Sequence, residues 1–322
     1  MRKIIYLLTL LLGVSLAACS DETIPEQPEK QEPEQPVEPN PDPEPEPPAE
    51  AKLPVLNVAG RYLKNEKGEI VNLHGFTQTY SPFFNNNAWG NYDVQACLRY
   101  NKSMVDGIVA AGWKFNFVRM HLDPYWSDDP SMQSVRYEGH ERFSETRFRK
   151  YLEELFVPIA EYFISKGMYV VMRPPGVCPE VIQVGGEYQK YLLDVWDVVS
   201  RNDSVKKYAG QISLELANEP ITCLDEEGKE SPRALYDFFQ PIVDMIRANG
   251  YTGVLWIPGT GYQSKYESFA VHPIEGYNIG YAVHTYPGWY GADDENYDHD
   301  AFIEQWGKQG PVAATNPILI SE

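Results

Sequence analysis

The chain has 322 residues, and its 46 acidic against 27 basic side chains give a formal net charge of −19. This acidic excess argues against nucleic acid as a partner, because phosphate backbones are bound through a surplus of Lys and Arg. Four cysteines are too few for a disulfide-stabilised scaffold of this length. Of the 13 Phe, 7 Trp and 22 Tyr, only Tyr6 lies before residue 53, so residues 53–322 are expected to carry the hydrophobic core.

The first 18 residues have the pattern of an export signal. Arg2 and Lys3 precede an apolar run, residues 4–14, that is too short to span a bilayer. Leu16-Ala17-Ala18-Cys19 follows, and it resembles the lipobox of bacterial lipoproteins. The resemblance implies a signal peptide over residues 1–18 and lipid attachment at Cys19. The alternative is an ordinary secretory signal in which the cysteine is incidental.

Residues 19–52 are expected to form a disordered tether. Residues 20–52 hold eleven acidic residues, two Lys and no aromatic residue, and Pro recurs throughout. Such a segment cannot bury enough apolar surface to fold, and as extended polyproline II, at about 3.1 Å per residue, it would span roughly 100 Å. Ser20-Asp21-Glu22 resembles the acidic signal of surface lipoproteins. We expect a monomer anchored to the outer membrane and facing the cell surface, with the periplasmic face as the alternative.

From residue 53 onward, short apolar runs alternate with helical patterns. A hairpin is expected first, from residues 55–63 and 70–76 around the turn Asn65-Glu66-Lys67-Gly68. Seven strands are expected, at Val71–Phe76, Phe115–Leu122, Met168–Met172, Ile212–Ala217, Val254–Ile257, Ile279–His284 and Ile318–Ser321. Helices are expected among them, at Lys102–Ala111, Phe148–Ser165, Tyr188–Val199, Ser231–Asn249 and Asp300–Gln309.

This alternation of strands and helices predicts the fold class. No glycine-rich phosphate loop follows the first strand, which disfavours a nucleotide-binding open sheet. Strands and helices that alternate over this length fit an α/β protein with a (β/α)8 barrel, which we assign to residues 53–322. The sequence ends directly after the seventh strand. We therefore expect the eighth strand and its helix to be missing from this chain, as in a fragment of a longer protein.

The ends of the predicted strands carry the candidate catalytic groups, because barrel enzymes place their active sites at the C-terminal ends of the strands. Glu219 follows the fourth strand and Glu322 the seventh, so their carboxyl groups are expected to face each other across the barrel. Hydrolysis of a glycosidic bond needs such a pair, since one carboxylic acid protonates the leaving oxygen and one carboxylate attacks the anomeric carbon. Their environments must therefore push the two pKa values apart.

Five segments at the predicted strands carry a family resemblance: residues 60–75, Val118-Arg119, Leu216-Ala217-Asn218-Glu219-Pro220, His284-X-Tyr286 and Pro317–Glu322. Together they resemble the motifs of family 5 glycoside hydrolases, the cellulase-type members of a clan of retaining (β/α)8 enzymes. The resemblance extends across most of residues 55–322. It implies a double displacement with net retention that needs no metal and no organic cofactor.

The resemblance also implies a role for each matching residue. Glu219 would be the general acid/base and Glu322 the nucleophile. Arg119 would keep Glu322 ionised, Tyr286 would donate a hydrogen bond to it, and Asn218 would bind the sugar 2-hydroxyl. Of the six histidines, four show no metal-ligand spacing, which speaks against zinc: His74, His140, His272 and His299.

Two departures from the family pattern concern the third and the eighth strand. The family usually carries a His at the end of strand three, whereas this chain has Arg173 there. His121 or Arg173 is expected to take over its role, and His284 to contact the sugar or a catalytic carboxylate. Residues 173–176, Arg-Pro-Pro-Gly, resemble a segment of β-galactosidases of the clan, which leaves exo-acting chemistry open. The Trp that the family presents after strand eight has no counterpart in this sequence.

Aromatic residues near the strand ends are expected to line a substrate groove. Trp126 follows the second strand and Trp289 the sixth, and such rings stack on the faces of sugars. An extended groove favours endo action on a β-linked polysaccharide, with glucan first and xylan or mannan next. A tethered glycan-binding protein without catalysis is the alternative from another class. Three cysteines remain after Cys19, and they form either one disulfide and a free thiol or three buried thiols: Cys97, Cys178 and Cys223.

Overall fold

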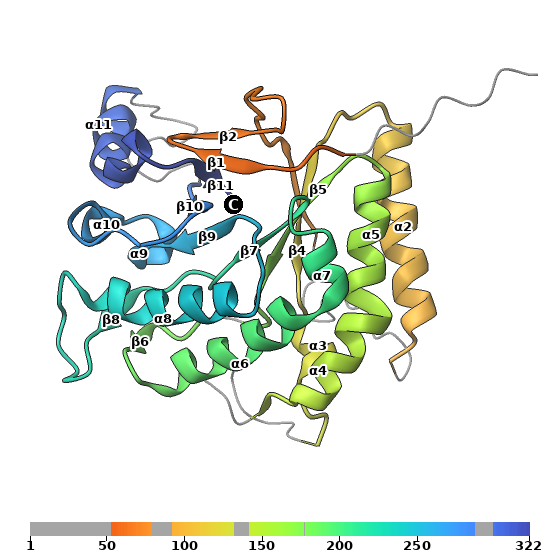
Figure 1. The fold of residues 1–322 in the computed structure, drawn as a ribbon, viewed down its shortest axis with the longest axis horizontal. Coiled ribbons are helices and arrows are strands. Elements are labelled where there is room, and N and C mark those ends of the chain that lie inside the picture. The colour runs from red at the N-terminus through yellow and green to blue at the C-terminus, as the bar shows by residue number, and fades with distance from the viewer. Residues whose placement is uncertain (1–52, 79–91, 132–141, 177, 287–298) are drawn as a thin grey trace, which may run out of the picture. The chain divides into compact units, whose positions relative to one another are not determined.

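The computed structural model describes residues 53–78, 92–131, 142–176, 178–286 and 299–322 (Figure 1). They belong to one compact unit, residues 50–322. The expected signal peptide (residues 1–18), the lipidated Cys19 and the tether (residues 19–52) lie outside the described residues and stay predictions. None of the helices in the described ranges has the length and apolar composition needed to cross a bilayer.

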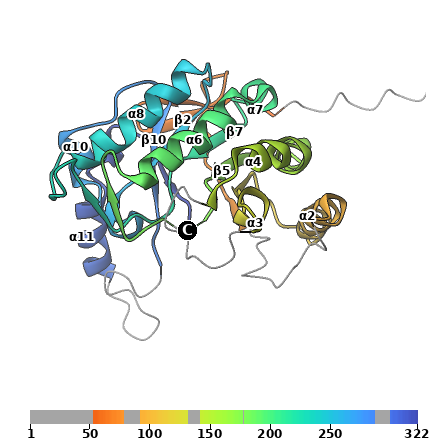
Figure 2. The same ribbon diagram turned by 90° about the horizontal axis from the view of Figure 1, so that it is seen from below.

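A seven-stranded parallel sheet forms the centre of this unit (Figures 1 and 2). Strands that follow each other along the chain are neighbours, in the order β3 (Gly75–Gln78), β4 (Phe117–His121), β5 (Tyr169–Arg173), β7 (Ile212–Glu215), β9 (Leu255–Pro258), β10 (Ile279–Val283) and β11 (Ile318–Ile320). The hydroxyl of Thr77 in β3 donates to the carbonyl of Ser321, just after β11, at 3.2 Å, so the sheet is curled. This is the expected (β/α)8 barrel fold, of which the described residues supply seven strands.

Amphipathic helices cover the outside of the curled sheet. The longer ones are α2 (Val94–Ala110), α5 (Val157–Ser165), α6 (Glu187–Arg201), α8 (Ala234–Ala248) and α11 (His299–Gln309). In α6, buried Leu192, Val195, Trp196 and Val199 recur every three or four residues, which places them on one helix face. Helix α2 packs against α5, and α6 against α8, so the helices form the outer layer of the barrel.

The expected helix at Phe148–Ser165 is one helical stretch with a π turn inside it. It consists of α4 (Glu145–Tyr151), the π-helical turn η2 (Leu152–Phe156) and α5. Pro158, in the first turn of α5, has no N–H to donate to the preceding turn, and π turns accommodate such interruptions. The stretch begins three residues before the expected start because Ser144 caps it, its side chain accepting from the N–H of Arg147 at 3.4 Å.

The N-terminal hairpin is formed by other segments than those predicted. Strands β1 (Asn57–Ala59) and β2 (Tyr62–Lys64) pair with each other, and all their residues except Lys64 lie in the stretch, residues 55–63, that was expected to be one strand. The expected turn at residues 65–68 exists, but only one bridge, between Lys64 and Ile70, follows it. Strand β3 begins at Gly75 rather than Val71, because the side chain of Asn116 holds the preceding segment. That side chain donates to the carbonyl of Asn72 at 2.7 Å and accepts from the N–H of His74 at 2.7 Å.

Short elements that the sequence did not predict lie in the segments that connect the barrel strands and the longer helices. Two of them, β6 (Val181–Gln183) and β8 (Thr222–Leu224), pair in parallel in the segments that follow β5 and β7. The others are α3 (Pro124–Ser127), α7 (Asp203–Lys207), α9 (Thr260–Gln263), α10 (Glu267–Val271) and η4 (Pro311–Ala314). Each has five residues or fewer, which is too short for a hydrophobic period to stand out in the sequence.

The inner face of the sheet is apolar near the N-terminal strand ends and charged near the C-terminal ends. Side chains two residues apart on a strand share a face. Thus Phe117 and Arg119 lie on one face of β4, and Leu319 and Ser321 on one face along β11. A small core cluster near the N-terminal ends contains Leu56, Leu63, Phe117, Tyr169, Val171, Val254, Trp256, Ala282 and Leu319. Polar side chains take the next positions toward the C-terminal ends, where the candidate site lies.

The three cysteines in the described part of the chain are free and buried. They are Cys97, Cys178 and Cys223, so the alternative with three buried thiols is the one observed. Burial raises the pKa of each thiol, which keeps all three protonated and unreactive at neutral pH.

Candidate active site

The two candidate carboxylates lie where β7 and β11 end. One carboxylate oxygen of Glu219, one of Glu322 and a ring nitrogen of His284 all lie within 4.8 Å of one another. Glu219 has a left-handed backbone conformation, with φ +60°. The N–H of Thr285 donates to the carbonyl of Glu322 at 3.0 Å, which continues the pairing of β10 with β11 as far as Glu322. The expected juxtaposition of the two carboxyl groups is therefore present.

Arg119, in the middle of β4, is fully buried and binds polar side chains from two other strand ends. Its Nε and Nη2 donate to the two carboxylate oxygens of Glu215 at 2.5 and 3.1 Å. Its Nη1 donates to Oε1 of Glu322, and Nη2 also donates to Oδ1 of Asn218 at 2.8 Å. Such charge-assisted, bidentate bonds are the strong ones among hydrogen bonds. One guanidinium thus fixes groups at the ends of β7 and β11 relative to each other.

His284 follows β10 and lies between the carboxylates. Its Nδ1 is 2.9 Å from Oε1 of Glu219 and 3.8 Å from Oε2 of Glu322. Its Nε2 is 3.6 Å from Oε1 of Glu215. Burial alone would lower the pKa of His284, but the nearby carboxylates of Glu215 and Glu219 outweigh it and raise that pKa. The imidazole can therefore carry a positive charge beside Glu219.

Tyr286 and Arg119 keep Glu322 ionised. The Tyr286 hydroxyl donates to Oε2 of Glu322. Burial alone would raise the pKa of Glu322, but the charges of Arg119 and His284 and the bond from Tyr286 lower it. Burial and the Glu322 carboxylate raise the pKa of Tyr286, so the phenol keeps the proton that it donates. Glu322 is an anion at neutral pH, which suits a nucleophile.

Glu215 is a member of the site that the sequence analysis missed. It is fully buried in β7. Besides Arg119, the Ser321 hydroxyl at 3.1 Å and the Gln263 side-chain amide at 3.0 Å donate to its Oε1. Burial alone would raise its pKa, but the charges of Arg119 and His284 hold the pKa of Glu215 well below its usual range. An acidic residue inside an apolar strand was the available signal, because such residues are almost never fully buried unless paired.

His121, the last residue of β4, and Arg173, the last residue of β5, are neighbours in the sheet and are both buried. Burial and the positive charges of Arg173 and Arg119 hold the pKa of His121 well below its usual value, so this imidazole is neutral. Burial and the charge of Arg119 lower the pKa of Arg173 to about 10, which leaves it protonated at neutral pH. The Arg173 guanidinium donates to the carbonyl of Gly176 at 3.1 Å. That either residue replaces the family's strand-three His stays a prediction.

Trp126 does not contribute to a substrate groove. It is 0% exposed, and its ring packs against Tyr92, Tyr125 and Tyr151 with ring centroids 4.8–5.8 Å apart. The expectation that it stacks on sugar is wrong, because α3, which carries Trp126, turns this side chain into the core. Trp289, the other expected aromatic contact, lies outside the described residues. The exposed ring of the site is Tyr286, at 40%.

Among the described residues, Glu219, His284 and Glu322 form the group whose spacing suits a metal ion. The charges around this group disfavour that use. Arg119 already donates to Glu322, and the raised pKa of His284 favours its protonated form, which cannot ligate a metal. The arrangement instead suits proton transfer and attack by a carboxylate.

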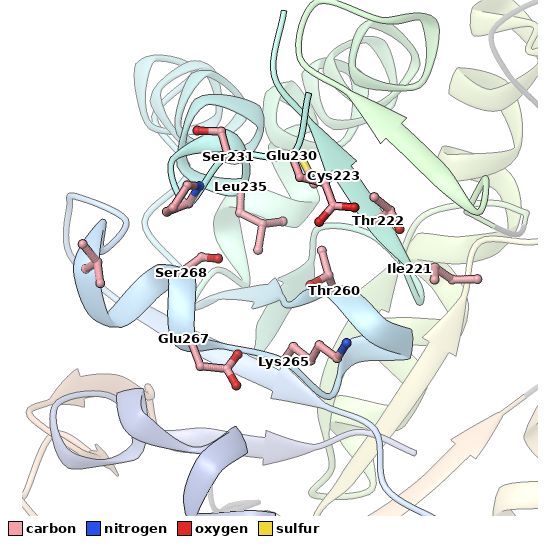
Figure 3. Close-up of a pocket in the computed structure, with 12 residues that line it drawn as sticks. Ile221, Thr222, Cys223, Glu230, Ser231, Leu235, Thr260, Lys265, Glu267 and Ser268 are labelled. Atoms are coloured by element: carbon pink, nitrogen blue, oxygen red, sulfur yellow. The ribbon is translucent and has the colours of Figure 1, made fainter. Parts of the chain in front are cut away.

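The structure also has a cavity of about 550 Å³ (Figure 3). The first lining residue along the chain is Ile221, two residues after Glu219. Glu230, before α8, and Lys265, before α10, reach into it from opposite sides. Neither catalytic candidate lines the cavity, so it is separate from the paired carboxylates. Its size lies within the range of ligand sites, about 300–1,000 Å³.

The fold and the site together define the class of protein. A curled parallel sheet with two close carboxyl groups at the C-terminal strand ends, one held ionised by an arginine, is the arrangement of a (β/α)8 glycoside hydrolase.

Comparisons with known proteins agree with this class. Residues 65–318 match the family model of cellulases, glycosyl hydrolase family 5. The chain is similar to the β-glucanase SdGluc5_26A from Saccharophagus degradans, with 18% identity over 83% of this chain and 72% of that chain and a TM-score of 0.57; the same enzyme is known in complex with cellotetraose. It is also similar to a family 5 cellulase from an Icelandic hot spring isolate, with 16% identity over 82% and 71% of the two chains and a TM-score of 0.53. No curated protein sequence matches it. The chain belongs to glycosyl hydrolase family 5.

Proposed function

We propose that this glycoside hydrolase is a retaining endo-β-1,4-glycanase in which Glu219 is the general acid/base and Glu322 the nucleophile. The observation that carries the proposal is the distance between their carboxylate oxygens, which is within 4.8 Å. Retaining enzymes hold the two carboxyl groups about 5–5.5 Å apart, whereas inverting enzymes separate them by about 6.5–9.5 Å to admit a water molecule. The spacing is close to the retaining arrangement and well short of the inverting one, so it supports a covalent glycosyl-enzyme.

In the first step, Glu322 attacks the anomeric carbon while Glu219 gives its proton to the leaving oxygen. Arg119 and Tyr286 lower the pKa of Glu322 and hold its two oxygens in place for attack. Because Oδ1 of Asn218 accepts from Arg119, the amide of Asn218 has a set orientation. Its Nδ2 can then donate to the sugar 2-hydroxyl, a bond that strengthens in the transition state.

In the second step, the ionised Glu219 takes a proton from water as the water attacks the glycosyl-enzyme. His284, with Nδ1 2.9 Å from Glu219, stabilises the negative charge that Glu219 carries between the two steps. The raised pKa of His284 suits this task, because a protonated imidazole is the better partner for a carboxylate.

β-Glucan is the proposed substrate class, with xylan and mannan as the nearest alternatives. The similar β-glucanase in complex with cellotetraose supports a β-1,4-linked glucan. The exposed ring of Tyr286 beside Glu322 offers an apolar face to a sugar. We also propose that the enzyme acts at the outer cell surface, on a lipid anchor at Cys19 and the tether of residues 19–52. The lipobox-like Leu16-Ala17-Ala18-Cys19 supports this location.

Substitution of the two carboxylates tests the proposal. We expect Glu219→Gln and Glu322→Gln each to lower the kcat on β-glucan by at least about 100-fold, whereas Glu226→Gln, at an exposed turn, leaves it unchanged. Reducing-end assays on glucan, xylan and mannan identify the polymer, and early product sizes separate endo from exo action. Proton NMR of the first product reports its anomer. Full activity of Glu219→Gln, or an inverted first product, would remove the proposed mechanism, and glycan binding without hydrolysis would indicate a binding protein.

A further inference from the structure

A left-handed turn lies beside the end of β7. Gly261, Tyr262 and Gln263 in α9 all have φ of +58°. Two of the three carry side chains, for which this conformation is unfavourable unless the surroundings hold it. Strain of this kind persists where the structure needs a particular geometry. The contacts of this turn are therefore expected to hold it in this conformation.

The turn runs along the segment that carries Glu219. The N–H of Gly261 donates to the carbonyl of Ile221 at 2.9 Å, and the N–H of Tyr262 to that of Pro220 at 3.2 Å. In the third contact the donor lies on the other segment and the acceptor is a side chain. The N–H of Glu219 donates to Oε1 of Gln263 at 2.7 Å. Three consecutive residues after β7 are thus bound to three consecutive residues of the turn.

The other polar atoms of Gln263 bind the remaining parts of the site. Gln263 is 0% exposed. Its Nε2 donates to Oε1 of Glu215 at 3.0 Å and to the carbonyl of Ala282 at 3.2 Å. Its own carbonyl accepts from the N–H of His284 at 3.1 Å. The buried side chain of Gln263 therefore connects the backbone of Glu219 with the carboxylate of Glu215 and with the backbone of β10, the strand before His284.

We propose that Gln263 is a positioning residue for Glu219. Glu219 itself has φ +60°, and a return to the β region would turn its Cα–Cβ bond, and so its carboxyl group, away from His284 and Glu322. Gln263 binds the N–H of Glu219 and keeps that peptide in place. Gln263 does not contact the reacting atoms, so it acts on the reaction through Glu219. This inference rests on the proposed role of Glu219 as acid/base.

The test compares two substrates that differ in their need for an acid. A β-1,4-glucan oligosaccharide has a poor leaving group and requires a proton from Glu219, whereas 2,4-dinitrophenyl β-cellobioside does not. We expect Gln263→Leu, which removes the polar atoms at similar size, to lower kcat/KM on the oligosaccharide about 100-fold and on the dinitrophenyl glycoside less than about fivefold. A merely structural role would lower both equally.

Gln189 offers a matched control, because it is buried with the same hydrogen-bond pattern. Its Oε1 accepts from the N–H of Gly185 at 2.6 Å, and its Nε2 donates to the carbonyls of Asp237 and Phe238 at 3.1 and 2.6 Å. None of these partners is at the site. Gln189→Leu is therefore expected to leave the ratio of the two kcat/KM values unchanged.

A second variant covers the case in which Gln263→Leu does not fold. In Gln263→Glu, the protonated carboxyl can still accept from the N–H of Glu219 and donate to Glu215, but the ionised form repels Glu215. Burial and the charge of Glu215 raise the pKa of the introduced carboxyl. The titratable and charged groups around it are Glu215, Glu219, Tyr266, His284 and, through Glu215, Arg119. We expect its kcat/KM on the oligosaccharide to fall with rising pH where the parent enzyme's is constant.

The outcomes separate this inference from the proposed function. Equal losses on both substrates with Gln263→Leu, or an unchanged pH profile with Gln263→Glu, would overturn the positioning role while Glu219→Gln still abolishes hydrolysis. Undiminished activity of Glu219→Gln would instead remove the acid/base assignment on which the inference rests.

Discussion

Glu215→Gln tests whether the buried ion pair of Arg119 and Glu215 stabilises the fold. The substitution keeps the size of the side chain but removes one of the two carboxylate charges that Arg119 contacts, the one that lies 2.5 and 3.1 Å from its Nε and Nη2. Both side chains are 0% exposed, so water cannot replace the lost partner. Breaking a buried pair in this way typically costs about 3–5 kcal/mol. Against a total stability of about 5–15 kcal/mol, this loss is large.

Urea denaturation followed by Trp fluorescence measures this cost. With an m-value near about 3 kcal/mol/M, the transition midpoint is expected to fall by about 1 M or more. The exposed pair of Glu145 and Arg149, at 2.7 Å with side chains 60% and 45% exposed, provides the control. Surface pairs contribute about 0–1 kcal/mol, so Glu145→Gln should barely shift the midpoint. Equal shifts for the two variants would refute the assigned importance of the buried pair.

The difference in unfolding free energy between the parent protein and Glu215→Gln is expected to depend on pH. The folded-state pKa of Glu215 is lowered, so its ionised form stabilises the fold above the unfolded-state pKa of about 4.3. That contribution is lost as the pH falls through the folded-state pKa. The stability difference between the parent protein and Glu215→Gln should therefore be largest at neutral pH and shrink below about pH 4. A difference that stays constant between pH 7 and pH 3 would contradict the lowered pKa.

Two further predictions concern single aromatic residues. Tyr286→Phe removes a hydrogen bond that lowers the pKa of Glu322, so the acid limb of kcat/KM against pH is expected to move to higher pH; an unmoved limb would show that Tyr286 does not affect this carboxylate. Trp126→Ala removes a fully buried ring and should cost about 3–5 kcal/mol in urea denaturation while KM stays within about twofold. A large rise in KM would place Trp126 in the substrate groove after all.

The sequence predicted the barrel well because the barrel strands are buried on both faces. β4, β5 and β10 have five buried residues each, and such strands are recognisable as short continuous apolar runs. The ends of these apolar runs located the strand ends. The resemblance to family 5 then selected Glu219 and Glu322 there. The start of β3 was predicted four residues too early, since the interaction that delays it comes from Asn116 on another strand end.

The residues that the sequence did not reveal depend on tertiary geometry. Gln263 enters the site because the chain turns left-handed at Gly261 and Tyr262, and only the glycine hints at such a turn. Trp126 was expected at the surface because it follows a barrel strand, but the one-turn helix α3 rotates it inward. Whether an aromatic side chain faces a groove or the core is decided by one turn of helix, and a four-residue element carries too little pattern to predict that.

The charges around Arg119 connect the buried ion pair with the proposed chemistry. Arg119 and a protonated His284 balance the two anions Glu215 and Glu322, so the resting group has no net charge when Glu219 carries its proton. In the proposed first step, Glu322 becomes an ester and Glu219 an anion, and the total charge stays the same. Only the position of the charge changes, over less than 4.8 Å, toward His284. A buried site can tolerate such a transfer because no net charge is created away from water.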